Sequence, residues 1–219
     1  YFPKAFASFV GRGLFFDGCT EKEIEAWRAR FIYLMRKLTL HQGGRPMLIK
    51  NPVYTGRVAM LRVIFPDAKF IHIRRNPYEV FVSMRNFYER LLKQFALQGY
   101  QHIDIDEAVL SVYPRLMGAL ERDAAALPAD RFIELRYEEL DREPMECLRE
   151  AHRALDLPGF SQAEGAFATY LASVQKFEKN KFAFPDEAAA KVEARWGEYI
   201  RKWRYQRPGV IAPPAPAEA

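Results

Sequence analysis

Cysteines and long apolar runs are both scarce in this sequence. The 219 residues include 2 cysteines, Cys19 and Cys147, which are too few for a disulfide scaffold and lack the spacing of metal ligands. No apolar run approaches the ~18 residues that a membrane-spanning helix needs, and no signal peptide is visible. We therefore expect small, buried or partly exposed thiols and a cytoplasmic location.

Two kinds of binding sequence are also missing. No loop of the G-x-x-x-x-G-K-S/T kind occurs, although such loops cradle phosphates in P-loop proteins. No basic run with interleaved aromatic residues marks a nucleic-acid strip, and the net charge is only +5. A P-loop phosphotransferase is a weak alternative, because the segment 69–73 ends in arginines and not in an Asp that could hold Mg²⁺. The small positive excess suits a small anionic ligand and does not argue for nucleic acid.

The remaining features are those of one α/β domain. Hydrophobic residues make up 49% and charged residues 28%, as in ordinary globular proteins. Strand-like segments at 47–50, 69–73 and 131–135 alternate with helical patterns, which indicates a parallel sheet. Asp106 is a candidate cap for a helical stretch that Pro114 should kink or split. We expect a domain over residues 1–207 and a disordered Pro/Ala-rich tail over residues 208–219.

The most informative stretch is 65–83, which reads as a buried strand that turns directly into a helix. Asn76 can cap this helix, and Pro77 fits its first position. Arg75 therefore stands at the carboxyl end of a strand beside a helix N-terminus, where open α/β sheets bind anions. Ser83 follows eight residues later, and its hydroxyl can donate to the same anion. On spacing alone, a plain ion pair for Arg75 and a packing role for Ser83 are equal alternatives.

This stretch resembles the 3′-phosphate-binding segment of the sulfotransferases, which use 3′-phosphoadenosine 5′-phosphosulfate (PAPS). Three further elements occur in family order. Residues 48–52 (Leu-Ile-Lys-Asn-Pro) resemble the family's "LKTP" or "LKSP" strand end, and residues 136–144 (Arg-Tyr-Glu-Glu-Leu-Asp-Arg-Glu-Pro) resemble its "RYEDL…P" element. Residues 177–182 (Phe-Glu-Lys-Asn-Lys-Phe) resemble its C-terminal basic loop. Each element is loose alone, but four in order are fairly specific and cover roughly residues 1–205.

The resemblance implies a P-loop-NTPase-like parallel sheet flanked by helices. It also implies transfer of a sulfuryl group from PAPS to a hydroxyl or amine of a small-molecule, glycan or lipid acceptor. Lys50 would contact the transferring group, and no metal is needed because lysines and helix N-termini can supply the positive field. Related sequences often have a His four residues after this Lys. Here Tyr54 stands there, and a phenol with a pKa of about 10 is a poor base at pH 7, so the base is not assigned.

The resemblance also implies how the nucleotide binds. Arg75 and Ser83 would hold the 3′-phosphate of PAPS, and Tyr137 would stack on or bond to the adenine. Either Lys179 or Lys181 in the basic loop would cover the same phosphate. For Tyr137 the competing interpretation is a strand-end ring packed on the next helix, and for the loop it is a solvated surface segment.

One family element has no counterpart in the sequence. The family places a phosphosulfate-binding loop similar to Arg-Ser-Gly-Thr-Thr upstream of these elements, and nothing in the 219 residues matches it. We therefore expect the C-terminal portion of a longer protein, with a sheet that is incomplete on its N-terminal side and no activity by itself. The alternative is a non-catalytic nucleotide-binding or interaction module derived from the same fold.

Overall fold

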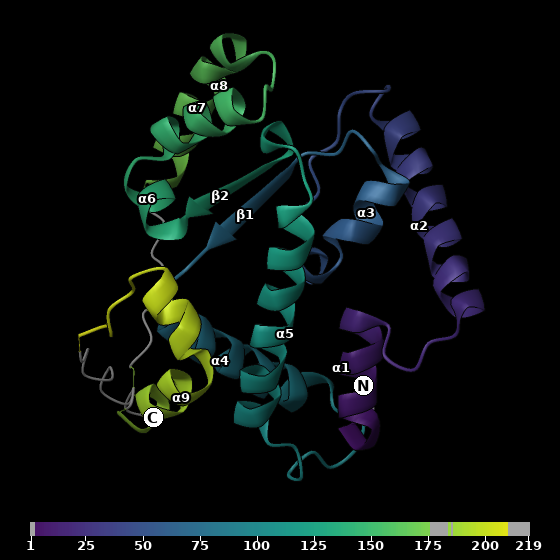
Figure 1. Cartoon of the computed structure of the whole chain (residues 1–219), viewed down its shortest axis with the longest axis vertical. Coiled ribbons are helices and arrows are strands. Elements are labelled where there is room, and N and C mark those ends of the chain that lie inside the picture. The colour runs from purple at the N-terminus through teal and green to yellow at the C-terminus, as the bar shows by residue number, and fades with distance from the viewer. Residues whose placement is uncertain (1–2, 176–183, 185, 210–219) are drawn as a thin grey trace.

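A computed structural model describes residues 3–175, 184 and 186–209. Its elements are α1 (Phe6–Phe15), α2 (Glu21–His41), α3 (Val58–Ile64), β1 (Phe70–Arg74), α4 (Pro77–Phe95), α5 (Ile105–Ala125), β2 (Phe132–Arg136), α6 (Tyr137–Arg142), α7 (Pro144–Ala154), α8 (Phe160–Val174) and α9 (Asp186–Lys202), with the short 3₁₀ helices η1 (Pro3–Ala5), η2 (Pro52–Gly56) and η3 (Ala129–Arg131). Figure 1 shows the two strands between a group formed by α6, α7 and α8 and a group formed by α2 and α3. Helices α4 and α9 lie at the carboxyl ends of the strands, and α5 runs from this region towards the start of β2.

The sheet consists of β1 and β2, which pair in parallel with Arg74 opposite Arg136. Both strands lie within one residue of their predicted ranges, so the prediction of a parallel sheet is confirmed for this pair. The chain crosses from one strand to the other through α4 and α5. On one face, Arg74 lies over the Trp203 ring at 5.9 Å, whereas Ile71 and Ile73 on the other face are exposed.

The prediction of a third strand at 47–50 is wrong, because this segment has no regular structure. Leu48 is 91% exposed and Ile49 is 41% exposed. No strand among the described residues pairs with it. An extended segment without a neighbour gains no ladder hydrogen bonds and buries little apolar surface, so strand propensity alone does not hold it.

The larger core lies between α4, α5 and α9, and Trp196 of α9 is its centre, with 0% exposure. Its ring stacks on Tyr113 with centroids 4.1 Å apart, and its Nε1–H donates to the carbonyl of Leu110 at 2.9 Å. Pro114 has no N–H for that carbonyl, which lies four residues earlier. The indole therefore satisfies the acceptor that proline leaves open. This explains why α5 continues through Pro114 and does not split there as predicted.

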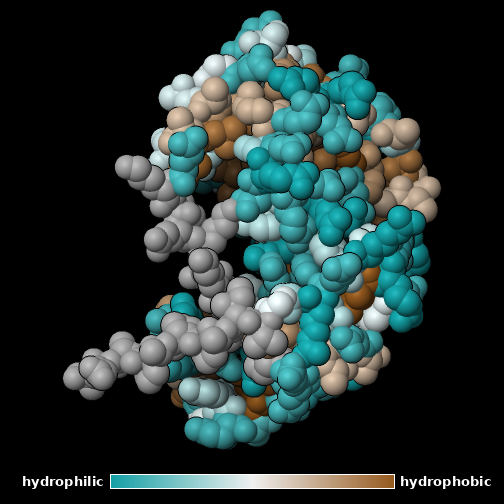
Figure 2. All heavy atoms as spheres, turned by 90° about the vertical axis from the view of Figure 1, so that its left-hand side faces the viewer, coloured by the Kyte–Doolittle hydropathy of each residue, from teal (hydrophilic) through white to brown (hydrophobic). Residues whose placement is uncertain are grey.

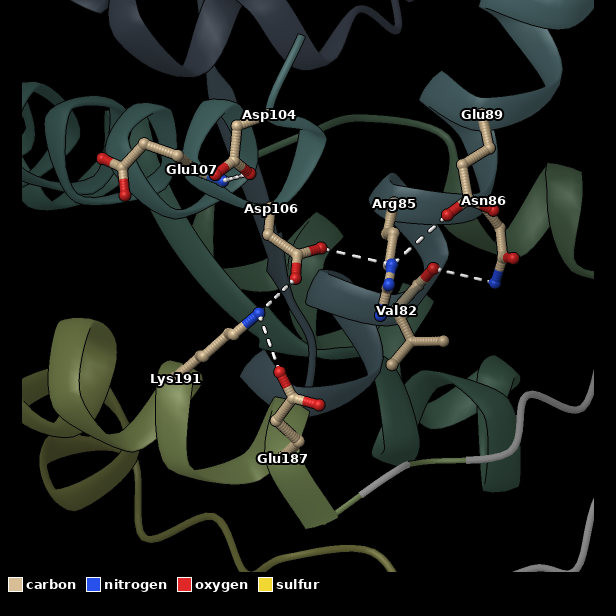
Figure 3. A network of polar contacts seen from close by, with 9 residues as sticks. All are labelled: Val82, Arg85, Asn86, Glu89, Asp104, Asp106, Glu107, Glu187 and Lys191. Atoms are coloured by element: carbon tan, nitrogen blue, oxygen red, sulfur yellow. Dashed lines mark hydrogen bonds and ion pairs between the residues drawn. The ribbon is translucent and has the colours of Figure 1, made fainter. Parts of the chain in front are cut away.

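A carboxylate network joins the same three helices (Figure 3). The Asp106 side chain on α5 is 14% exposed and pairs with Lys191 of α9 at 2.8 Å and with Arg85 of α4 at 3.2 Å. The cap of α5 is Asp104, which accepts from the backbone N–H of Glu107 at 2.9 Å, so the capping role predicted for Asp106 is wrong. A shared, largely buried carboxylate fixes the position of α4 relative to α5 and α9.

A smaller core packs α2 against α3 through Phe31, Met35 and Leu61. The Trp27 and Phe31 rings stack with centroids 5.0 Å apart. In the part of the chain that the structure describes, no helix is both long and apolar enough to cross a membrane. The face that carries α6 to α9 is mostly hydrophilic, with hydrophobic patches in its upper part at the height of α7 and α8 (Figure 2).

Candidate functional site

The carboxyl ends of β1 and β2 bring together two predicted nucleotide-binding residues. Arg75 and Tyr137 are the residues that follow the paired Arg74 and Arg136. The guanidinium of Arg75 lies over the Tyr137 ring, 4.6 Å from its centroid. Parallel strands end at the same edge of a sheet, and this register explains how residues far apart in the sequence meet.

Arg75 is held on a second side by Glu79, which lies in the first turn of α4. Its Nε donates to Glu79 Oε2 at 2.9 Å, and its Nη2 lies 2.8 Å from the same oxygen. The Nη1 of Arg75 donates to no residue that the structure describes, and the side chain is 32% exposed. The ion pair considered from the sequence is therefore present, but it uses only one edge of the guanidinium. The other edge is left for a further acceptor.

Ser83 lies on the same face of α4 as Glu79, one turn further along the helix. Residues spaced by four lie one above another on a helix, so Glu79 and Ser83 share a face of α4, and Arg75, which precedes the helix, reaches Glu79 from the strand end. Ser83 also lines an open hollow along α4, together with Phe87 and Arg90. The role of Ser83 in binding an anion stays a prediction.

Lys50 lies just before η2 and is exposed. The next residue, Asn51, caps η2 by accepting from the backbone N–H of Val53 at 3.0 Å. Among the described residues, none forms a hydrogen bond or an ion pair with Lys50. Tyr54 packs in the smaller core, with its ring edge-on to Phe31 at 5.9 Å. This is a packing role, and it gives no support to Tyr54 as a base.

Glu138 is a residue of this site that the sequence analysis missed. Its Oε1 accepts from the backbone N–H of Asn76 at 2.9 Å, and its Oε2 accepts from the hydroxyl of Tyr205 at 2.9 Å. The side-chain amide of Asn76 also donates to the carbonyl of Gln206 at 3.0 Å. The segment after α9 is therefore tied to the start of α4. These partners lie 62 and 67 residues from Glu138, so no local spacing could have revealed them.

Carboxylates lie next to the arginines at the strand ends and balance part of their positive charge. Glu134 lies 2.8 Å from Arg74 Nε and 3.0 Å from His72 Nδ1. Burial works to raise the pKa of Glu134, but its contacts with His72 and Arg74 outweigh burial and lower this pKa. Burial, followed by the bond to Glu138, raises the pKa of Tyr205 to about 12, so its phenol is a donor at neutral pH. Within the described ranges, no group of three or more His, Cys, Asp or Glu could hold a metal ion.

Residues 15–162 match the model of a sulfotransferase family. The chain belongs to the sulfotransferase family. The matched region includes the motif that contains Lys50, the strand-to-helix turn after β1 and the start of α6. The resemblance drawn from these elements is therefore confirmed at the level of the family.

Two curated proteins are similar to this chain. They are the omega-hydroxy-beta-dihydromenaquinone-9 sulfotransferases Stf3 of Mycobacterium bovis and Mycobacterium tuberculosis, each 31% identical over 186 residues. The alignments cover 85% of this chain and 48% of each relative, so the chain spans about half the length of the curated relatives it matches.

A solved structure, sulfotransferase STF9 from Mycobacterium avium, matches with a TM-score of 0.64 and 18% identity. The match covers 76% of this chain and 44% of that chain. At this identity the likeness shows the fold, and it confirms the predicted P-loop-NTPase-like α/β class.

Two predicted site residues, Lys179 and Lys181, lie outside the described residues. The predicted tail over 208–219 is described only at Pro208 and Gly209. The geometry at the strand ends therefore rests on Arg75, Tyr137 and their immediate partners.

Proposed function

We propose that this protein transfers a sulfuryl group from PAPS to a hydroxyl or amine of an acceptor. The observation that carries the proposal is the contact between Arg75 and Tyr137 at the carboxyl ends of two parallel strands. A strand end beside a helix N-terminus suits an anion, and an aromatic ring at the same edge suits a purine base. Membership of the sulfotransferase family supports this choice of nucleotide.

In this proposal, Arg75 and Ser83 bind the 3′-phosphate and Tyr137 contacts the adenine. Arg75 offers the phosphate the guanidinium edge that Glu79 leaves open. Lys179 or Lys181 covers the phosphate from the C-terminal loop. Arginine suits this task because its planar fork can bind two phosphate oxygens at once.

Lys50 is proposed as the group that acts on the transferring sulfuryl oxygens. Sulfuryl transfer needs in-line positioning of the two reactants and positive charge near the transferred and leaving oxygens. An exposed lysine with no ion pair among the described residues keeps its charge available for such a contact. Because that charge stabilises the transition state more than the ground state, Lys50 should affect kcat more than KM.

The acceptor that we favour is the hydroxyl of a lipid-like molecule. The support is the name of the two curated relatives, which act on a hydroxylated menaquinone derivative and are 31% identical to this chain. Transfer to another small-molecule or glycan acceptor is an alternative result of the assay described below. A cytoplasmic location remains a prediction.

A non-catalytic nucleotide-binding module is the second candidate function. The specific observation in its favour is that the 219 residues contain no Gly-rich loop similar to Arg-Ser-Gly-Thr-Thr. Backbone N–H groups of such a loop would hold the 5′-phosphosulfate, and half a site cannot align the donor. Residues 1–219 expressed alone are therefore expected to give no turnover.

A transfer assay separates the two candidates. Labelled PAPS is offered with a panel of isoprenoid alcohols, phenols and amines to the complete gene product and to residues 1–219 alone. We expect no transfer by residues 1–219 alone and transfer by a gene product that also contains a loop similar to Arg-Ser-Gly-Thr-Thr, in which Lys50→Ala should lower kcat at least about tenfold with little change in the KM for PAPS. Robust turnover by residues 1–219 would contradict the half-site argument. Nucleotide binding without transfer by the complete product would favour the module.

A further inference from the structure

We infer that Glu138 is a positioning residue for the nucleotide site, because it fixes the peptide that joins Arg75 to Asn76. This inference rests on the proposed binding of PAPS at the strand ends. It adds a residue that acts through Arg75 and that neither the motif spacing nor the relatives assign.

The carboxylate of Glu138 joins three segments that are distant in the sequence. Oε1 accepts from the Asn76 N–H at the start of α4, and Oε2 accepts from the Tyr205 hydroxyl after α9, both at 2.9 Å. The Nε of Arg136, at the end of β2, lies 3.4 Å from Oε2. Both oxygens are therefore occupied by groups of the protein, and Glu138 is placed to support the site and not to contact a ligand.

The bond to Asn76 acts at the point where the chain leaves β1 and enters α4. The N–H that Glu138 accepts belongs to the peptide whose carbonyl comes from Arg75. Asn76 is the cap of α4, and its Oδ1 accepts from the N–H of Tyr78 at 3.2 Å. With the peptide held from one side and the cap from the other, the backbone that carries Arg75 is fixed, and Glu79 then holds its guanidinium. Glu138 also follows Tyr137 directly, so both members of the Arg75–Tyr137 contact depend on one carboxylate.

The charge of Glu138 also matters at this sheet edge. Arg74 and Arg136 stand opposite each other in the register, and like charges in that arrangement are destabilising. Glu134 pairs with Arg74 at 2.8 Å and Glu138 pairs with Arg136, so each strand-end arginine has its own carboxylate. Arg75 has its own carboxylate in Glu79, and its guanidinium lies over the Tyr137 ring.

The test compares three variants of the 219-residue chain by calorimetric titration with 3′,5′-adenosine bisphosphate. Glu138→Ala should weaken binding roughly tenfold, equivalent to about 1.4 kcal/mol, because the Asn76 N–H loses its acceptor and Arg75 loses its fixed direction. Glu138→Gln should rescue affinity to within about threefold, because its amide oxygen can still accept from Asn76.

The matched control is Lys69→Ala at the opposite end of β1. Lys69 Nζ donates to the carbonyls of Leu155 and Asp156, so its removal also costs stability but leaves the strand ends intact. We expect a lower melting temperature and unchanged affinity. Backbone hydrogen exchange gives a second readout, since the Asn76 amide should exchange faster in Glu138→Ala but not in Lys69→Ala.

Each failure of this test has a distinct meaning. Wild-type affinity in Glu138→Ala, or an equal loss in Lys69→Ala, would overturn the positioning role and leave the proposed function standing. Unchanged Asn76 exchange in Glu138→Ala would overturn it as well. If the unsubstituted chain binds no bisphosphate, the nucleotide site itself is wrong and the inference falls with it.

Discussion

The chain contains one local pattern twice, and the two copies have different structures. Residues 50–52 and 75–77 both read as a basic residue, Asn and Pro after an apolar run. In both copies the asparagine accepts from the backbone N–H two residues further on, at 3.0 Å for Asn51 and 3.2 Å for Asn76. The capping contact is therefore local in each case, although Asn76 also bonds to the distant Glu138 and Gln206.

The strand before the turn forms in only one copy. The segment before Asn76 is β1, which pairs with β2 along its length, whereas the segment before Asn51 is irregular and Leu48 in it is exposed. The basic residues differ in the same way, because Arg75 contacts Glu79 and Tyr137, whereas Lys50 has no such contact among the described residues. The comparison shows that caps are local, while strands and oriented site residues need a distant partner.

The largest effect on the turn at residues 75–77 should come from removing the centre of the core that packs on α4. Trp196→Ala should lower the free energy of unfolding by about 3–5 kcal/mol, because it leaves a cavity and also removes the donor to the Leu110 carbonyl. Urea unfolding followed by circular dichroism measures this loss. Phe9→Ala is a control on an exposed ring and should change the stability by less than about 0.5 kcal/mol. A loss below about 1 kcal/mol for Trp196→Ala would show that this core does not anchor α4.

A smaller effect separates the two caps. Asn76→Ala should lower the free energy of unfolding by about 1–2 kcal/mol, since Asn76 caps a helix of 19 residues and also donates to Gln206. Asn51→Ala should cost about 0.5 kcal/mol or less, because η2 has 5 residues and its neighbouring segment is exposed. The same urea titrations test both variants. Equal losses would mean that the two copies are equally integrated into the fold.

The sequence predicted an element correctly where its own residues carry the signal, or where the strand that it pairs with also has a clear pattern. The strand before Arg75, the strand after Arg131 and the Asn76 cap were predicted because each has apolar, capping or turn residues of its own. The segment 47–50 was predicted wrongly, since strand propensity says nothing about whether a neighbour exists. The passage of α5 through Pro114 was also missed, because it depends on an indole donor from α9.

The candidate site divides in the same way. Arg75 and Tyr137 could be identified because strand ends and family motifs mark them, and their contact follows from the parallel register. Glu138 could not be identified, because its role comes from two hydrogen bonds to segments that only the folded chain brings near. The eight-residue spacing of Arg75 and Ser83 was visible in the sequence, but Glu79 as the partner of Arg75 became clear only from the structure.

The most direct test of the central claim is a ligand comparison at Arg75, with Lys50 as the matched control. The 219-residue chain is titrated calorimetrically with 3′,5′-adenosine bisphosphate and with 5′-AMP, which lacks the 3′-phosphate. Arg75→Ala should lose about 1.5–3 kcal/mol of binding free energy for the bisphosphate, which is roughly a tenfold to more than a hundredfold loss of affinity. Its affinity for 5′-AMP should change little. Lys50→Ala should bind both nucleotides as the unsubstituted chain does, because neither carries a sulfuryl group. Unchanged affinity of Arg75→Ala for the bisphosphate would contradict the account.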